Sequence, residues 1–235
     1  MKWIFKWLFR LLIAAVVLVI VAVIVLLLTY NSILRLAMQQ QIRAQTGMDA
    51  EIGSFNLALI SPTVEIQNLK IHNSKDFAGT PFLDIPEIHV EYDRAALARR
   101  EVHITLMRFN LGELDIVKNQ AGQTNIFLAG LKLPANKSGG NGNALANFKR
   151  QSGYDFTGID VLNVSIGKVK YIDLNNQQNN REQTIGIEDC VMKNVKSPTD
   201  LMGLAADIAL HSNGFFDSFA DQKNPGLNVL RQLGL

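Results

Sequence analysis

The chain has 235 residues, 48% of them hydrophobic and 19% charged, and its 23 basic residues nearly balance its 21 acidic ones. This length allows one or two domains, and the balanced charge argues against a nucleic-acid partner, which needs a strongly basic surface. Cys190 is the only cysteine, so an intramolecular disulfide is excluded. Metal-ligand spacing and catalytic motifs are absent from the sequence, and we therefore expect no enzyme activity, no cofactor and no metal.

The first element in chain order is an apolar run over residues 11–28, "LLIAAVVLVIVAVIVLLL". Eighteen helical residues extend about 27 Å, close to the roughly 30 Å hydrocarbon core of a bilayer. The run predicts a single transmembrane anchor over residues 11–30. Lys2, Lys6 and Arg10 precede it and mark the cytoplasmic side, so residues 1–10 are expected in the cytoplasm and everything after Tyr30 across the membrane.

A cleaved signal peptide is the alternative interpretation of this run. A signal peptide has an apolar region of about 7–15 residues followed by a small-x-small cleavage site. Here the run is longer and continues into "TYNSILRLAMQQQIRAQTG", which lacks such a site. We therefore favour an uncleaved anchor.

The remaining chain divides into a stalk, a β domain and a C-terminal helical segment. Residues 31–47 predict a helical stalk that ends at Gly47, and residues 48–196 predict strands, interrupted by a linker at 134–153 that is rich in Gly, Asn and Ser. Residues 197–235 predict helices, the first with Ser197 as N-cap and Pro198 at the first helical position, and a short one after Pro225.

The predicted strands share an unusual spacing in which the apolar alternation slips by one residue, Φ-x-Φ-x-x-Φ-x-Φ. A β-bulge explains this slip, because one extra residue bends the strand and returns the side chains to their original face. We expect such strands to form a sheet bent into a gutter, apolar inside and polar outside. The six copies are Ala50/Ile52/Phe55/Leu57, Val64/Ile66/Leu69/Ile71, Leu83/Ile85/Ile88/Val90, Ile104/Leu106/Phe109/Leu111, Ile159/Val161/Val164/Ile166 and Ile185/Ile187/Cys190/Met192.

Two segments agree over a longer stretch and indicate an internal repeat. "ITLMRFNLGELDI" at 104–116 and "IDVLNVSIGKVKY" at 159–171 match at a constant offset, with Gly112 and Gly167 at the same point of each. Glycine tolerates positive φ and close backbone approach, so we expect the pair to lie at the crease of the sheet.

Residues 47–126 carry a family resemblance, in "GSFNL", "NLKIHN", "LDIPEIHVEYD", "RAALAR" and "GELDIVKNQAGQTNI". Together with the preceding apolar run and "IDVLNVSIGKVKYIDL" at 159–174, this ensemble resembles the AsmA-like proteins. The resemblance implies a bacterial inner-membrane protein with a periplasmic repeating β-groove, acting in phospholipid movement and outer-membrane homeostasis. This chain is shorter than the family's long bridges.

Two functional hypotheses follow for the apolar face. In the first, it is a groove that binds membrane phospholipid, with further copies of the chain or other envelope proteins as partners. In the second, it is a core covered by the helices of residues 197–233, and the protein is a scaffold or assembly subunit of an envelope complex. The candidate groove residues are Ile52, Phe55, Val64, Ile66, Leu69, Ile71, Ile85, Ile88, Val90, Ile104, Leu106, Phe109, Leu111, Val161, Val164, Ile166, Ile185 and Ile187.

Overall fold

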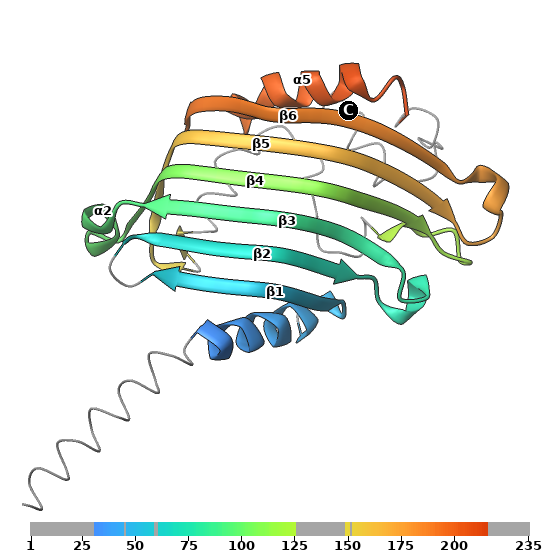
Figure 1. Ribbon diagram of the computed structural model, residues 1–235, viewed down its shortest axis with the longest axis horizontal. Coiled ribbons are helices and arrows are strands. Elements are labelled where there is room, and N and C mark those ends of the chain that lie inside the picture. Colours follow the sequence, from blue (N-terminus) through green and yellow to red (C-terminus); the bar gives the residue numbers. More distant parts are fainter. Residues whose placement is uncertain (1–30, 45, 59–60, 126–148, 151, 216–235) are drawn as a thin grey trace, which may run out of the picture.

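The computed structural model describes residues 31–44, 46–58, 61–125, 149–150 and 152–215, and these form one curved six-stranded sheet with helices along its margins (Figure 1). The expected mainly β architecture is confirmed for this part of the chain. The strands are β1 (Asp49–Ala58), β2 (Thr63–His72), β3 (Pro81–Tyr92), β4 (Glu101–Lys118), β5 (Asp155–Asp173) and β6 (Arg181–Val195).

Helices flank the two edge strands and cap the strand ends. Residues 31–44 are helical, and Gly47, with φ +69° and its N–H bonded to the Arg43 carbonyl, ends that stalk as expected. The C-terminal helix begins with a 3₁₀ turn in which Ser197 and Asp200 form a capping box. The remaining elements are η1 (Lys75–Phe77), α2 (Arg94–Ala98), η2 (Gln177–Asn179), η3 (Pro198–Leu201) and α5 (Met202–His211).

The strands follow one another in chain order across the sheet, and only β4 and β5 run parallel. From His103↔Gly158 to Lys118↔Asp173, the partners in these two strands differ by 55 residues, which is the offset of the internal repeat. The repeat is therefore visible as an in-register parallel pair. Gly112 and Gly167 lie side by side in it, at a point where the ladder is interrupted between Leu111↔Ile166 and Glu113↔Lys168.

A line of interrupted pairing crosses the sheet and corresponds to the expected crease. The β1–β2 ladder skips Gly53 and Asn68, and the β2–β3 ladder skips Asn68 and Pro86. The line continues past Gly112 and Gly167 to β6, where the register shifts beside Gly186. Asn68 and Gly186 have positive φ, and a proline without an N–H is tolerated here because the ladder is already interrupted.

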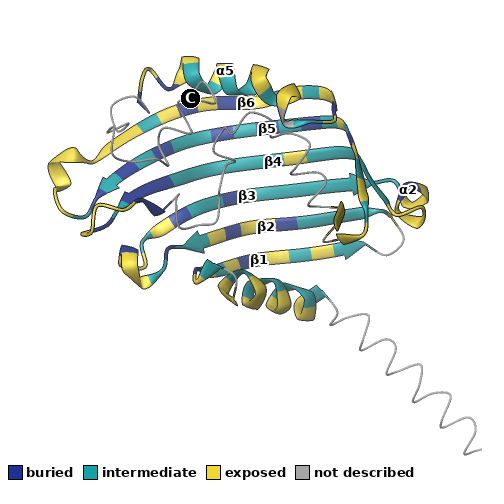
Figure 2. Ribbon diagram, turned by 180° about the vertical axis from the view of Figure 1, so that it is seen from behind, coloured by how far each residue is buried: buried dark blue, intermediate teal, exposed yellow. Residues whose placement is uncertain are grey.

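A second line of interruption runs through β4, β5 and β6 and shifts the register between β3 and β4. The β4–β5 ladder skips Thr105 and Asp160, the β3–β4 register shifts beside Thr105, and Asn194 of β6 has positive φ. Near this line the ends of the strands turn sharply, as both views show (Figures 1 and 2). The sequence predicts a single crease, whereas the described strands carry this second line of bulge-like irregularity as well.

Several expectations lie outside the described residues. They are the anchor at 11–30, the orienting residues Lys2, Lys6 and Arg10, most of the linker at 134–153, and the helix after Pro225. Among the helices within the described ranges, none is long and apolar enough to cross a membrane.

Candidate functional site

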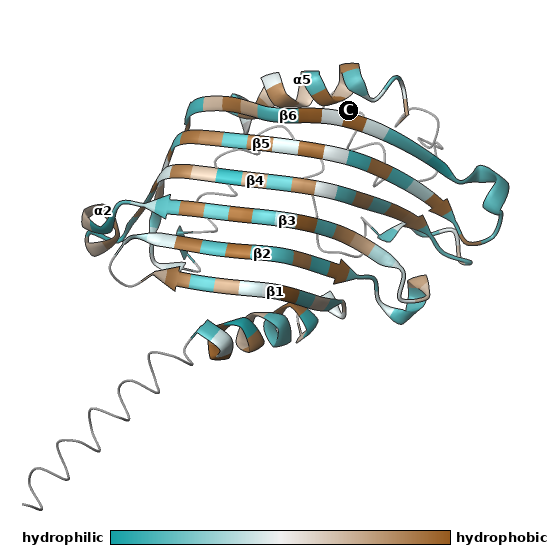
Figure 3. Ribbon diagram, viewed as in Figure 1, coloured by the Kyte–Doolittle hydropathy of each residue, from teal (hydrophilic) through white to brown (hydrophobic). Residues whose placement is uncertain are grey.

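One face of the sheet is continuously apolar from β1 to β6. Its buried side chains form two clusters, one centred on Ile66 and Ile85 and the other on Val164 and Ile185. Half-buried side chains of the middle strands, such as Phe109, pack against both clusters and join them. The alternation of apolar and polar residues along each strand, visible in Figure 3, places these side chains on one face.

Thirteen of the eighteen candidate groove residues belong to these two clusters. In β1, β2, β3 and β6 the clusters follow the slip as the spacing predicts. Val64, Val90 and Ile104 belong to neither cluster and lie near the strand ends beside α2. The thirteen are Ile52, Phe55, Ile66, Leu69, Ile71, Ile85, Ile88, Phe109, Leu111, Val164, Ile166, Ile185 and Ile187.

The predicted slip in β4 and β5 is wrong by two residues, and Leu106 and Val161 lie on the opposite face. Pairing runs without interruption through Leu106↔Val161 and Met107↔Leu162, so neighbours at these positions point to opposite faces. Met107 and Leu162 join the apolar cluster, whereas Leu106 pairs with Glu91 and Val161 with Lys193. The extra residue sits instead at Thr105 and Asp160.

The described helices cover the margins of this face. Leu201, Leu204 and Ile208, in η3 and α5, pack against the cluster that contains Ile185 and Ile187. At the other margin, Met38 of the 31–44 helix packs against the cluster that contains Ile52. Ile88 and Phe109, which pair with one another between these margins, remain half-buried.

The 31–44 helix also occupies the free edge of β1. The side-chain oxygen of Asn31, Oδ1, accepts from the Leu57 N–H at 3.1 Å, and the Arg35 guanidinium donates to the Gly53 carbonyl at 2.9 Å. These side chains satisfy backbone groups that would otherwise be open to strand pairing. They therefore hinder extension of the sheet from β1 by a further strand.

The opposite face of the sheet carries several cross-strand ion pairs. Lys70 of β2 lies 3.7 Å from Asp84 of β3, and Glu87 of β3 lies 3.5 Å from Arg108 of β4. Glu113 of β4 receives hydrogen bonds from both Lys168 and Lys170 of β5. The expected division into an apolar and a polar face is therefore observed.

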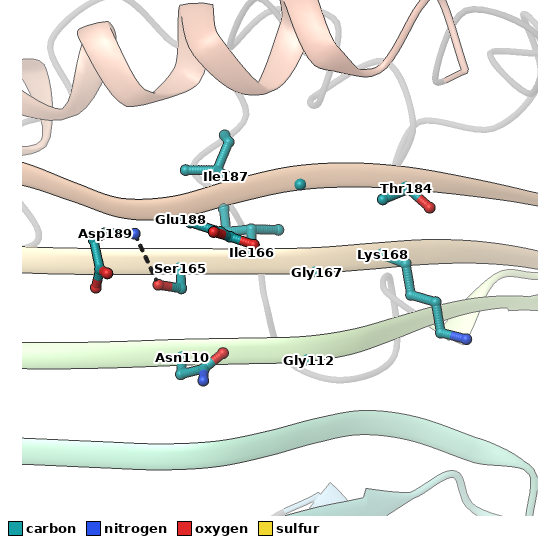
Figure 4. Close-up of a pocket in the computed structure, with 11 residues that line it drawn as sticks. Asn110, Gly112, Ser165, Ile166, Gly167, Lys168, Thr184, Ile187, Glu188 and Asp189 are labelled. Atoms are coloured by element: carbon teal, nitrogen blue, oxygen red, sulfur yellow. Dashed lines mark hydrogen bonds between the residues drawn. The ribbon is translucent and has the colours of Figure 1, made fainter.

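The crease opens a shallow depression of about 610 Å³ on this polar face (Figure 4). Its walls come from β4, β5 and β6 and include Asn110, Lys168 and Glu188. The Asp189 N–H donates to the Ser165 hydroxyl at 3.0 Å across it. Its polar lining sets it apart from the apolar face.

A buried amide network closes the end of the sheet opposite α2. Asn125 is fully buried; its side chain accepts from the Val117 N–H at 2.9 Å and donates to the Asp115 carbonyl at 2.7 Å and to the side-chain oxygen of Asn73 at 3.1 Å. Such an asparagine joins two segments by satisfying backbone groups that a strand partner would otherwise pair. No pattern in the sequence predicts this network.

Beside the network, the carboxyl of Asp115 is buried with an oxygen, Oδ1, that has no hydrogen-bond partner. Burial, reinforced by the charge of Glu113, raises the pKa of Asp115 to about 7. Burial also acts to raise the pKa of Glu113, but hydrogen bonds from Lys170 and Lys168 outweigh it and leave that pKa lowered. The pKa values of these two neighbouring carboxyls are therefore shifted in opposite directions.

Glu65, Glu87 and His89 bring one potential metal-ligand atom each to within 4.8 Å of one another. Their partners are already protein groups, because the His89 Nε2 atom lies 3.1 Å from Glu91 and Glu65 accepts from Gln67. We assign no ion to this cluster.

Comparison with models of known protein families gives a match over most of the chain. The model of the AsmA family matches residues 1–210. No curated protein and no solved structure matches the chain.

Proposed function

The chain belongs to the AsmA family, and from this membership we propose that it is a membrane-anchored envelope protein that binds phospholipid acyl chains on the apolar face of its sheet. Family membership is consistent with a function in the cell envelope. In the proposed topology, residues 11–30 anchor the protein in the bacterial inner membrane, with the N-terminus in the cytoplasm and the sheet in the periplasm.

The observation that carries this proposal is the half-buried apolar band between the two helical margins. Ile88 and Phe109 lie in its middle, where Phe109 packs against both buried clusters and Ile88 against the one that contains Ile66 and Ile85. An acyl chain laid on such a band gains roughly 0.8 kcal/mol for each methylene removed from water and requires no polar recognition group. The band could thus hold a lipid tail by burial alone.

A scaffold function is the second candidate, and the packing of α5 favours it. Leu204 and Ile208 already cover the apolar side chains of β6. If the rest of the apolar face were covered by other parts of the chain, it would be a core and would leave no room for lipid.

Site-specific photo-crosslinking in cells separates these two functions. We expect a photo-reactive residue at Ile88 or Phe109 to form adducts with phospholipid, detected by mass spectrometry of the purified protein. Leu106 and Val161 are matched controls, because they are half-buried residues of the middle strands on the opposite face. They should yield background levels of lipid adduct.

The other outcomes of this experiment count against lipid binding in the groove. Adducts from Ile88 and Phe109 only to residues 197–233 would support the scaffold. Equal lipid adducts from both faces would indicate general exposure to the membrane rather than a groove.

A further inference from the structure

The proposed membrane anchor leaves open how the sheet stands relative to the bilayer, and one end of the fold has the composition of a membrane-contact surface. We propose that the end carrying α2 and the start of the 31–44 helix rests on an anionic lipid surface, with Ile33, Leu36 and Leu97 in the interfacial layer and Arg99 and Arg100 against lipid phosphates. This docking surface rests on the proposed function, because it presumes the anchor at residues 11–30.

The first observation is the uneven exposed face of the 31–44 helix. Its inner face, which includes Arg35 and Met38, packs on β1. On the outer face Ile33 and Leu36 are 56% and 54% exposed, whereas the later outward residues Gln40 and Arg43 are polar. The large exposed apolar side chains of this helix are thus confined to its first two turns, next in sequence to the apolar run. Large apolar side chains facing outward at this place fit the acyl–headgroup boundary better than water.

The second observation is that contacts place α2 at the same end of the sheet (Figure 1). Asn31 bonds to Leu57 at the end of β1, and β1 turns there into β2. The Tyr92 N–H donates to the Pro62 carbonyl in that turn at 2.9 Å, and α2 begins two residues after Tyr92. The helix start and α2 can therefore face one surface together.

The third observation is the chemistry of α2 and its flank, "RAALARR" at 94–100. Leu97 is 39% exposed, and Arg94, Arg99 and Arg100 are exposed around it. An apolar side chain ringed by arginines is typical of segments that bind anionic membrane surfaces, where each cation adds attraction to lipid phosphates. Each acidic neighbour has a partner of its own: Asp93 caps α2, Glu101 pairs with Arg99 at 2.9 Å, and Asp155, beside Arg100, pairs with Lys149 at 2.8 Å.

Fluorescence quenching of the full chain in vesicles tests the docking surface. In a Cys190→Ala background, the substitutions Leu36→Cys, Leu97→Cys and Gln178→Cys each provide one site for an environment-sensitive label. Gln178 lies in η2, at the opposite end of the sheet. In vesicles of phosphatidylethanolamine and phosphatidylglycerol, we expect lipids with a quencher on the acyl chain to quench labels 36 and 97, but not label 178.

Charge removal tests the arginines. We expect Arg99→Gln with Arg100→Gln to weaken docking about fivefold for each lost cation, and so to lower the quenching of label 97 in anionic vesicles but not in phosphatidylcholine vesicles. Lys75→Gln with Arg181→Gln removes the same charge from the opposite end and should leave it unchanged.

Two results would overturn the docking surface. One is quenching of label 97 no greater than that of label 178, and the other is equal effects of the two double substitutions. Neither result bears on lipid adducts at Ile88 and Phe109, so the docking surface can fail while lipid binding in the groove stands.

Discussion

Replacing Gly167 by alanine is expected to destabilise the sheet by about 3–5 kcal/mol. A Cβ atom at this position would lie 2.4 Å from the backbone carbonyl oxygen of Gly112 in the neighbouring strand. No rotamer relieves this overlap, because both groups belong to the backbone of paired strands. Urea denaturation of the detergent-solubilised chain, followed by circular dichroism in the β region, measures the loss.

Two other glycines provide graded controls for this substitution. A Cβ at Gly112 would meet the Pro86 ring at 3.3 Å, so Gly112→Ala should cost less, about 1–2 kcal/mol. Gly203 in α5 has open space around it, and Gly203→Ala should be neutral or stabilising by up to about 1 kcal/mol. If Gly167→Ala costs no more than Gly112→Ala, close approach of β4 and β5 is not the reason for glycine at the crease.

The unequal costs expected for alanine at Gly167 and at Gly112 refine the role that the sequence predicts for this glycine pair. Both glycines lie at equivalent points of the repeat, but neither is among the residues with positive φ. Glycine is required at Gly167 because the backbone of the neighbouring strand approaches closely there. The left-handed backbone conformation, the other reason for a glycine, occurs instead at Asn68 and Gly186 on the line of the crease. The offset of the repeat was predictable because parallel, in-register pairing keeps the two segments chemically alike.

The phase of β4 and β5 was harder to predict than that of their neighbours. Leu106 and Met107 are adjacent apolar residues, as are Val161 and Leu162, so apolarity alone cannot decide which of each pair faces the clusters. The cross-strand partners show which residue of each pair faces the clusters, because Leu106 lies opposite Glu91 and Val161 opposite Lys193 on the polar face. Cross-strand register is information that a single strand does not contain.

The burial of Asp115, at the end of the sheet opposite α2, could not be predicted from the sequence either. Asp115 lies in "ELDIV" between the apolar residues Leu114 and Ile116, and this alternation is typical of a polar residue that points to solvent. It is buried because β3 and the segment that ends in Asn125 pack around it, with Phe82 and Asn125 themselves almost fully buried. Burial of this kind comes from segments far apart in the chain.

We expect Asp115→Asn to stabilise the protein at pH 8 by about 2–4 kcal/mol and to have little effect at pH 4. The pKa of this carboxyl is raised to about 7 from an ordinary value of 3.8. Between these values the folded protein holds a proton that the unfolded chain has released, so the group's contribution to stability falls as the pH rises from about 4 to about 7. The uncharged amide removes this penalty. The measurement is the urea midpoint of both proteins from pH 4 to pH 8.

Glu113→Gln is the matched variant, and its effect should have the opposite sign. Hydrogen bonds from Lys170 and Lys168 overcome the effect of burial and lower the pKa of Glu113, so its charge stabilises the fold above the ordinary value of 4.5 and loses this effect as the pH falls. The Gln variant should therefore be less stable than the native chain at pH 8 and approach it at low pH. Parallel pH profiles for Asp115→Asn and the native chain would contradict the raised pKa of the buried Asp115 carboxyl, whereas profiles that diverge above pH 4 in opposite directions for the two variants would support it.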